Sequence, residues 1–391
     1  MRTEHFAASA QSRGLARAKG FSLVELMVGV AVGLIGVLAI MQAFQVNEGY
    51  KRSTTGTGLA QANGAIALFS IEREARMAGY GFINSEALGC NTISWYYDGQ
   101  YSSPPGAPGP SALPPITLAP ILITPGAAGA PDAITITYGN DDKRLIPTTT
   151  LTHPSSSAEI FVNDNYGFNE NDLFVIAQGG SCQMYNATKL NTANVARLQK
   201  NPGAAGKFNP PGNGLFGNYG TGATVLNLGQ LSVNRYDISN NDLRVTQLFS
   251  FSGVNTLPTL SNQTQVLVND IVDLKAYYGK DTNGDGNIDI WDKVQPTTAA
   301  GWLQVTALRI SMLARSGNYE KPSRAGDPCT ATQAAPKFVK DPSKDPTVAA
   351  AVGSAASRYE YFTIPGGLPS CYKFRAFETV VPLHNLIWKV S

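Results

Sequence analysis

The chain has 391 residues, of which 43% are hydrophobic and 15% are charged, and its 30 basic and 28 acidic residues leave a net charge of +2. This composition excludes a chain that is disordered throughout, and the near-neutral charge argues against nucleic acid as a partner. The 39 glycines and 24 prolines gather into several stretches, which excludes an all-helical protein.

The N-terminus combines a basic flank with a long apolar segment. Residues 1–20 contain four Arg or Lys residues against one acid, and no charged residue occurs from 26 to 47. About 22 helical residues at ~1.5 Å each span roughly 33 Å, enough to cross the hydrocarbon layer of a membrane. The basic flank predicts a cytoplasmic N-terminus, with the rest of the chain beyond the inner membrane in the periplasm.

The boundary between flank and apolar segment contains Gly20, Phe21 and Glu25. This boundary closely resembles the type IV prepilin signature, in which Gly and Phe follow a basic leader and Glu stands at the fifth mature position. The resemblance implies that residues 1–20 are a leader, that a prepilin peptidase cuts after Gly20, and that Phe21 is then methylated. The apolar segment would remain in the mature protein as part of a helix over 21–79.

Glu25 also has a physical interpretation of its own. A carboxylate near the end of an apolar helix is costly in a membrane unless it finds a partner. Cleavage would create an ammonium group at Phe21 that can neutralise Glu25 in the same chain or in a neighbouring subunit. The alternative is a plain signal anchor in which Glu25 reaches the membrane interface.

The helical pattern weakens over residues 49–58, which are rich in Gly, Ser and Thr, and predicts a partly unwound section there. Periodicity returns with four apolar residues at three- and four-residue spacing, and Gly79 is expected to end the helix. We expect the apolar stripe to pack under a soluble head; its members are Leu59, Ala62, Ile66 and Phe69.

Residues 80–391 are predicted to form a β-rich head. Short strands are expected at 133–138, 159–162, 173–177, 231–236, 243–249, 266–278 and 302–313. Without regularly alternating helices, the strands should pair antiparallel, separated by long Pro/Gly-rich loops at 102–131, 202–222 and 322–347. The predicted fold class is therefore α+β, with a long N-terminal helix packed on an antiparallel β-sheet head.

Several segments are similar to PilW-type minor pilins. They are the helix end at 72–81 with its Ala-Gly-Tyr, the segments at 171–176 and 272–279, and the C-terminal stretch 380–386. The resemblance implies a minor pilin in the priming or tip complex of a type IV pilus. Its implied partners are other minor pilins and the major pilin, contacted through the N-terminal helix, and a large tip adhesin. The alternatives are a type II secretion pseudopilin and a surface-displayed adhesin module.

Residues 281–292 fit the twelve-residue calcium loop of EF-hands. Oxygen-bearing side chains occupy positions 1, 3, 5, 7, 9 and 12, and Gly286 stands at the turn position 6. The predicted Ca²⁺ ligands are Asp281, Asn283, Asp285, Asn287, Asp289 and Asp292. The preceding segment alternates like a strand, so we expect an isolated loop with a structural calcium. The alternative is a solvated hairpin turn.

Four cysteines follow the apolar segment, and no two form a CxxC pair, which argues against zinc. Outside the cytoplasm an even number favours two disulfides, with three possible connectivities. Pairing between sequence neighbours, Cys90 with Cys182 and Cys329 with Cys371, is the simplest, and the second pair would hold the Pro-rich stretch at 322–347. Buried free thiols are the alternative.

Enzymatic activity is not predicted. Outside the leader the histidines are His153 and His384, and neither has neighbours that suggest a catalytic triad or a metal site.

Overall fold

The computed structural model describes residues 20–82, 86–97, 99, 101–102, 116–139, 146–153, 157–191, 196–211, 219–322, 324, 326–344 and 357–387. The chain divides into two compact units, Met1–Ser53 and Thr54–Ser391. The predicted leader, apart from Gly20, lies outside the described residues.

Helix α1 (Leu23–Ala75) runs without interruption through residues 49–58, so the predicted unwound section is wrong. Part of the reason is local, because Arg52 Nε lies 2.9 Å from Glu48 Oε1 one turn away. Part is tertiary, since Gly56 is buried and a Cβ there would lie 3.2 Å from the Ser316 side chain. A small residue at this position allows the helix to approach the head closely.

The buried face of the second half of α1 is not the predicted one. Leu59, Ile66 and Phe69 are 48%, 55% and 65% exposed. The buried positions instead carry mostly small side chains at intervals of three and four residues, namely Gly56, Ala60, Gly64, Ala67, Ile71 and Ala75. The expectation failed because the sheets come so close to the helix that mostly small residues fit between them.

The helix also ends four residues before the predicted Gly79. Beyond Ala75 the amides of Met77 and Ala78 bond to carbonyls three residues back, which marks a tightened final turn. Gly79 has φ +79°, and its amide donates to Thr137 O at 2.9 Å. This left-handed glycine turns the chain from the helix onto the sheet.

Within the described parts of the chain, the strands form three larger sheets and two short ribbons. The nine-stranded sheet has the order β11-β12-β8-β7-β13-β9-β10-β1-β4 and contains β1 (Asn91–Ile93), β4 (Ile116–Thr117), β7 (Thr148–Thr152), β8 (Glu159–Val162), β9 (Leu173–Gln178), β10 (Ser181–Asn186), β11 (Lys189–Asn191), β12 (Arg197–Gln199) and β13 (Thr224–Gly229). The ribbons are β2 (Tyr96–Tyr97) with β3 (Tyr101–Ser102), and β20 (Lys337–Val339) with β21 (Tyr359–Tyr361).

The other two sheets pack against α1. The five-stranded sheet, in the order β16-β15-β14-β6-β5, contains β5 (Ile121–Thr124), β6 (Ala133–Tyr138), β14 (Ser232–Ser239), β15 (Asp242–Ser250) and β16 (Thr259–Val268). The four-stranded sheet, in the order β18-β17-β19-β22, contains β17 (Ile271–Lys280), β18 (Ile290–Asp292), β19 (Val305–Arg315) and β22 (Phe374–Pro382). The short helices are η1 (Ala127–Gly129), α2 (Ala299–Leu303) and α3 (His384–Ile387).

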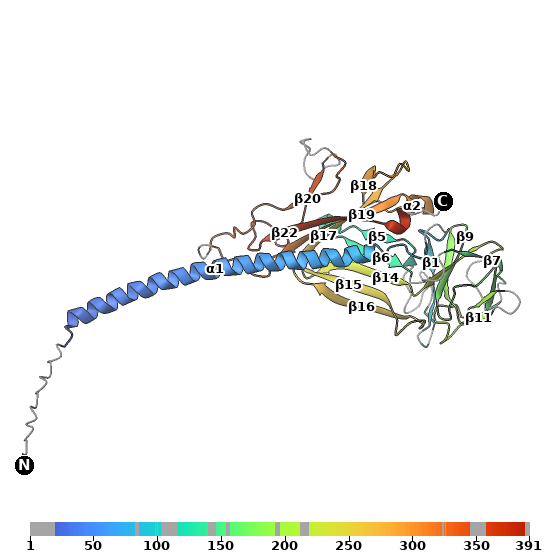
Figure 1. Cartoon of the computed structure of the whole chain (residues 1–391), viewed down its shortest axis with the longest axis horizontal. Helices are drawn as coiled ribbons and strands as arrows, with labels where there is room; N and C mark the ends of the chain where they lie inside the picture. The colour runs from blue at the N-terminus through green and yellow to red at the C-terminus, as the bar shows by residue number, and fades with distance from the viewer. Residues whose placement is uncertain are drawn as a thin grey trace, which may run out of the picture. The chain divides into compact units, whose positions relative to one another are not determined.

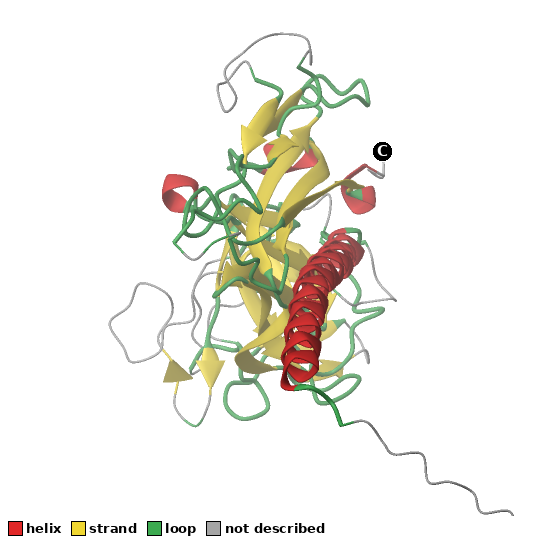
Figure 2. Ribbon diagram, turned by 90° about the vertical axis from the view of Figure 1, so that its left-hand side faces the viewer, coloured by secondary structure: helices red, strands yellow, loops and turns green. Residues whose placement is uncertain are grey.

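The C-terminal part of α1 lies along these sheets (Figures 1 and 2). Glu74 Oε2 accepts from Asn234 Nδ2 in β14 at 2.9 Å, and Asn63 Nδ2 donates to Asn269 O between β16 and β17 at 3.1 Å. Ala67, Ile71 and the inward side chains of both sheets form one continuous hydrophobic core. The helix is therefore part of the head's core from residue 54 onward.

Two strand predictions need correction. Residues 266–278 are not one strand, because β16 ends at Val268 and β17 begins at Ile271. Asp270, with φ +60°, makes the turn between them, and Asn and Asp tolerate this left-handed conformation better than most residues. Residues 302–303 belong to α2, so β19 begins at Val305.

The predicted fold class is confirmed. Among the described strands every neighbouring pair is antiparallel except β1 with β10, and a long apolar helix packs on this β-rich head. The Pro/Gly-rich stretches also contain structure, since β4, β5 and η1 lie within 102–131 and β20 lies within 322–347.

Candidate functional site

The N-terminal motif forms a reciprocal cap at the start of α1. Ser22 Oγ accepts from Glu25 N at 3.2 Å, while Glu25 Oε2 accepts from Ser22 N at 3.1 Å. This is a capping box, which satisfies amides that have no partner within the helix. The Ser at this spacing from Glu25 was the sequence signal for it. Gly20 and Phe21 precede the cap outside the helix and are exposed.

The first half of α1 is apolar and exposed. Its large hydrophobic side chains, from Leu23 at 77% to Phe44 at 69%, all keep more than half of their surface exposed. The helix is long and apolar enough to span a membrane. Exposure of this much apolar surface requires either lipid or other apolar helices around it.

The predicted calcium loop connects β17 to β18 and is a series of tight turns. Asp281 Oδ1 and Oδ2 accept from the amides of Gly284 at 2.6 Å and Gly286 at 2.9 Å. Asn283 Oδ1 accepts from Asp285 N at 2.9 Å. These side-chain turns curl the loop around its own oxygen-bearing residues. Gly284 and Gly286 have φ +79° and +86°, which glycine adopts without strain.

The remaining predicted ligands divide into two groups. Asp285 and Asp289 lie inside the curl, because Asn283 Nδ2 is 3.3 Å from both Asp285 Oδ2 and Asp289 Oδ1. Asn287 donates its amide to Asp285 Oδ1 at 2.7 Å. Asp292 lies in β18, where its Oδ1 is 2.6 Å from Lys280 Nζ. The structure therefore gathers positions 1 to 9 of the loop and places position 12 in an ion pair.

The donor set of this loop suits Ca²⁺ in its chemistry, since it consists of carboxylate and amide oxygens. Five of these oxygens, on Asp281, Asn283, Asp285 and Asp289, however, accept hydrogen bonds from loop amides. Among the described residues, no three His, Cys, Asp or Glu side chains are grouped as metal ligands. A bound cation would therefore have to rearrange the acidic side chains.

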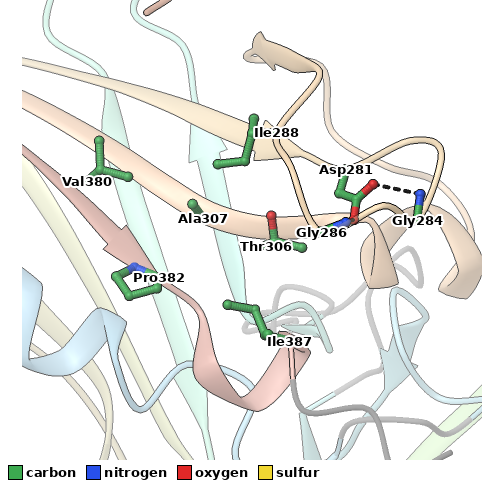
Figure 3. A pocket seen from close by; sticks show the side chains of 9 residues that line it. All are labelled: Asp281, Gly284, Gly286, Ile288, Thr306, Ala307, Val380, Pro382 and Ile387. Atoms are coloured by element: carbon green, nitrogen blue, oxygen red, sulfur yellow. Dashed lines mark hydrogen bonds between the residues drawn. The ribbon is translucent and has the colours of Figure 1, made fainter.

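The loop forms one wall of a hollow of about 450 Å³ (Figure 3). Asp281, Gly284 and Gly286 line it from the loop, while Val380 and Pro382 line it from the end of β22. The conformation of the loop therefore contributes to the shape of this hollow.

Both disulfides have the pairing favoured by the sequence. Cys90 bonds to Cys182 with a Cα–Cα distance of 6.3 Å, and Cys329 bonds to Cys371 with a Cα–Cα distance of 4.8 Å. The first bond lies within the main core and joins the segment before β1 to β10. The second joins two segments that also pair through Thr332 and Ser370.

His153 is buried in a second core beside the rings of Tyr185 and Tyr219, and neither of its ring nitrogens has a hydrogen-bond partner among the described residues. Burial, with Lys200 nearby, lowers the pKa of His153 to about 4. The imidazole is therefore neutral at neutral pH and almost fully buried. It packs as an apolar ring against Tyr185 and Tyr219.

A long N-terminal apolar helix packed on a β-rich head, with the Gly20–Phe21–Glu25 motif at its start, is the arrangement expected of a type IV pilin. The model of the prokaryotic N-terminal methylation motif matches residues 15–41, and the model of the type IV pilus-assembly protein W, PilW, matches residues 235–385. A comparison with curated proteins gave no match. Among solved structures, a type IV-like pilin from Thermus thermophilus is similar at 12% identity and a TM-score of 0.32, covering 83% of this chain and 96% of its own.

The two family matches confirm the resemblance to PilW-type minor pilins. Together they support a minor pilin of a type IV pilus. Proteins of this class are structural components.

Proposed function

We propose that this minor pilin joins the complex that primes type IV pilus assembly or forms the pilus tip. The observation that carries the proposal is the first half of α1, whose apolar side chains are exposed on every side. In the inner membrane lipid would cover this surface, and in a filament the apolar helices of other pilins would cover it. The head, residues 80–391, is bulky for a subunit repeated along a whole filament, which favours a minor component.

Processing would prepare the helix to pass from the membrane into the filament. Cleavage by prepilin peptidase after Gly20 would leave Phe21 as the N-terminus, with an ammonium group close in sequence to Glu25. An opposite charge lowers the cost of holding Glu25 in an apolar environment. The partner would be this ammonium or that of a neighbouring pilin. The N-terminus would face the cytoplasm and the head the periplasm, with the pilus surface as the final location.

The partners follow from this role. The first half of α1 would contact the other minor pilins and the major pilin, and the head would contact a large tip adhesin. Deletion of the gene should abolish surface pili and twitching motility while secretion stays normal. Complementation with wild type should restore piliation, and complementation with E25A should not. Glu48, paired with Arg52 on the same helix, offers the matched control, because E48A should restore pili fully.

The same experiment separates the other two functions. Lost secretion with normal piliation would contradict the proposal in favour of a type II secretion pseudopilin. Normal piliation with lost attachment would favour a surface adhesin.

We also propose that the loop at residues 281–292 binds one structural Ca²⁺. Asp281, Asn283, Asp285 and Asp289 would supply side-chain oxygens, and Asn287 would supply its carbonyl. Asp292 would bind the ion only if its ion pair with Lys280 broke, and the loss of that pair would lower the affinity for Ca²⁺. The proposal is supported by the ligand spacing and by the curled turns of the loop.

Calcium should raise the stability of the wild-type protein. For a site with a dissociation constant typical of extracellular modules, 10 mM Ca²⁺ should add roughly 1–3 kcal/mol. The double variant D281A/D285A should melt below wild type in calcium and show no calcium response. Melting followed by circular dichroism, in calcium and in chelator, measures both. The exposed Glu170 provides a control outside the loop, since E170A should keep the response. Equal melting of wild type with calcium and with chelator would contradict the proposal.

A further inference from the structure

The two faces of the five-stranded sheet differ in chemistry. Ile134, Ile136 and Tyr236 belong to the main core, and Asn234 donates to Glu74 of α1. Because side chains alternate along a strand, the residues between these positions lie on the opposite face. That second face is turned away from α1 and mixes polar side chains with a few apolar ones, among them Leu122 and Val233.

A continuous row of side chains crosses this second face. The strand registers pair Leu122 with Thr135, Thr135 with Arg235, Arg235 with Thr246, and Thr246 with Thr264. Arg235 therefore stands between Thr135 and Thr246 in the register of the two neighbouring strands. This row borders a hollow of about 290 Å³, which we call the Arg235 hollow.

The charges beside the hollow leave a net positive charge. Asp237 Oδ1 accepts from Arg244 Nε at 3.0 Å and from Arg244 Nη2 at 2.7 Å. Arg235 Nε is 3.7 Å from Asp237 Oδ2, beyond hydrogen-bonding distance. Two guanidinium groups thus share one carboxylate, and the Arg235 side chain is 45% exposed. A guanidinium that shares its carboxylate and is partly exposed can bind a second carboxylate through two parallel hydrogen bonds.

The lining also contains an unpartnered polar group. Thr137 belongs to the lining, is 1% exposed, and its hydroxyl has no hydrogen-bond partner among the described residues. Leaving a buried hydroxyl without a partner costs free energy unless a ligand or water supplies one. At the rim, Asn262 has φ +43° where the register of β15 and β16 shifts, a conformation that redirects its side chain.

We propose that the Arg235 hollow binds a sugar that carries a carboxylate. Arg235 would hold the carboxylate, and the hydroxyls of Thr135, Thr137 and Thr246 would bond to the sugar's hydroxyls, because each can both donate and accept. Leu122 and Val233 in the lining supply apolar surface for the ring carbons. The volume lies near the lower end of small-molecule pockets and suits roughly one sugar ring. This site goes beyond the assembly role and does not depend on it.

Ligand-observed saturation-transfer NMR on the full-length protein in detergent tests the proposal. Glucuronate and N-acetylneuraminate serve as carboxylated sugars, glucose as a neutral sugar, and inorganic phosphate as an anion without a ring. We expect both carboxylated sugars to bind and to bind more tightly than glucose or phosphate. R235Q should weaken their binding at least ~10-fold, since it removes a charge-assisted bond. T135V should weaken it roughly threefold through the loss of one hydroxyl.

Arg375 provides the matched control, because it is an exposed arginine on β22 and R375Q should leave sugar binding unchanged. T135V changes no charge, so it tests the site even where R235Q fails to fold, which the melting temperature of each variant reveals. The proposal is overturned by equal binding of glucose and glucuronate, by phosphate binding as tightly as the sugars, or by wild-type affinity in R235Q or T135V.

Discussion

Replacing both Cys90 and Cys182 with alanine lowers the free energy of unfolding by about 4 kcal/mol in an oxidising buffer. The bond closes a sequence separation of 92 residues, so its loss releases a long loop in the unfolded chain. Both cysteines are also buried, at 8% and 1% exposure, within the core that includes α1. Urea unfolding followed by tryptophan fluorescence measures the change.

The reduced proteins provide the control for this prediction. With a strong reductant both disulfides of the wild type open, and the Cys329–Cys371 bond of the variant opens too. The two proteins should then differ only by the packing of the substituted side chains, about 1 kcal/mol. Coincident unfolding curves in the oxidising buffer would show that the bond contributes nothing to stability.

The second large effect concerns the close approach of α1 to β22. A Cβ on Gly64 would overlap three carbons of the Phe377 ring, so G64A forces the ring or the helix to move. Overpacking of this kind costs about 1–3 kcal/mol, partly offset by the better helix propensity of alanine. We therefore expect G64A to lower the free energy of unfolding by about 2 kcal/mol. F377L in the same chain should restore part of the loss by making room.

Gly58 lies in the same helix and offers the matched control. A Cβ there meets no atom within 4 Å, and the residue is exposed. G58A should raise the free energy of unfolding by up to about 1 kcal/mol through helix propensity alone. Urea unfolding of both variants gives the comparison. If G64A is as stable as G58A, α1 does not pack against β22 as closely as the structure has it.

Local sequence patterns predicted the parts of this protein whose structure depends on residues that are neighbours in the sequence. The apolar segment and the Gly20–Phe21–Glu25 motif predicted a long helix with a processing site at its start, and β6 and β8 occupy the predicted residues. The turns of the loop at 281–292 could be predicted because Asp, Asn and Gly at this spacing favour them. The capping by Ser22 follows from the same local chemistry.

The features that these patterns failed to predict depend on residues that are far apart in the sequence. The spacing of Leu59, Ile66 and Phe69 does describe one side of the helix, but it is the exposed side. The buried side is set by how closely the sheets approach, and Phe377, more than 300 residues away, occupies the space over Gly64. Likewise, Asp292 has the spacing of a calcium ligand, yet the pairing of β17 with β18 places it against Lys280.

The sequence by itself therefore determined the class of protein, the membrane-length helix and its processing motif, because these depend on short-range spacing and hydrophobicity. Only the tertiary structure decided which face of α1 is buried, that the helix continues through residues 49–58, and that Thr135 and Thr246 flank Arg235 on the two neighbouring strands. Sheet register brings such residues together across long stretches of chain, and no local period in the sequence records it.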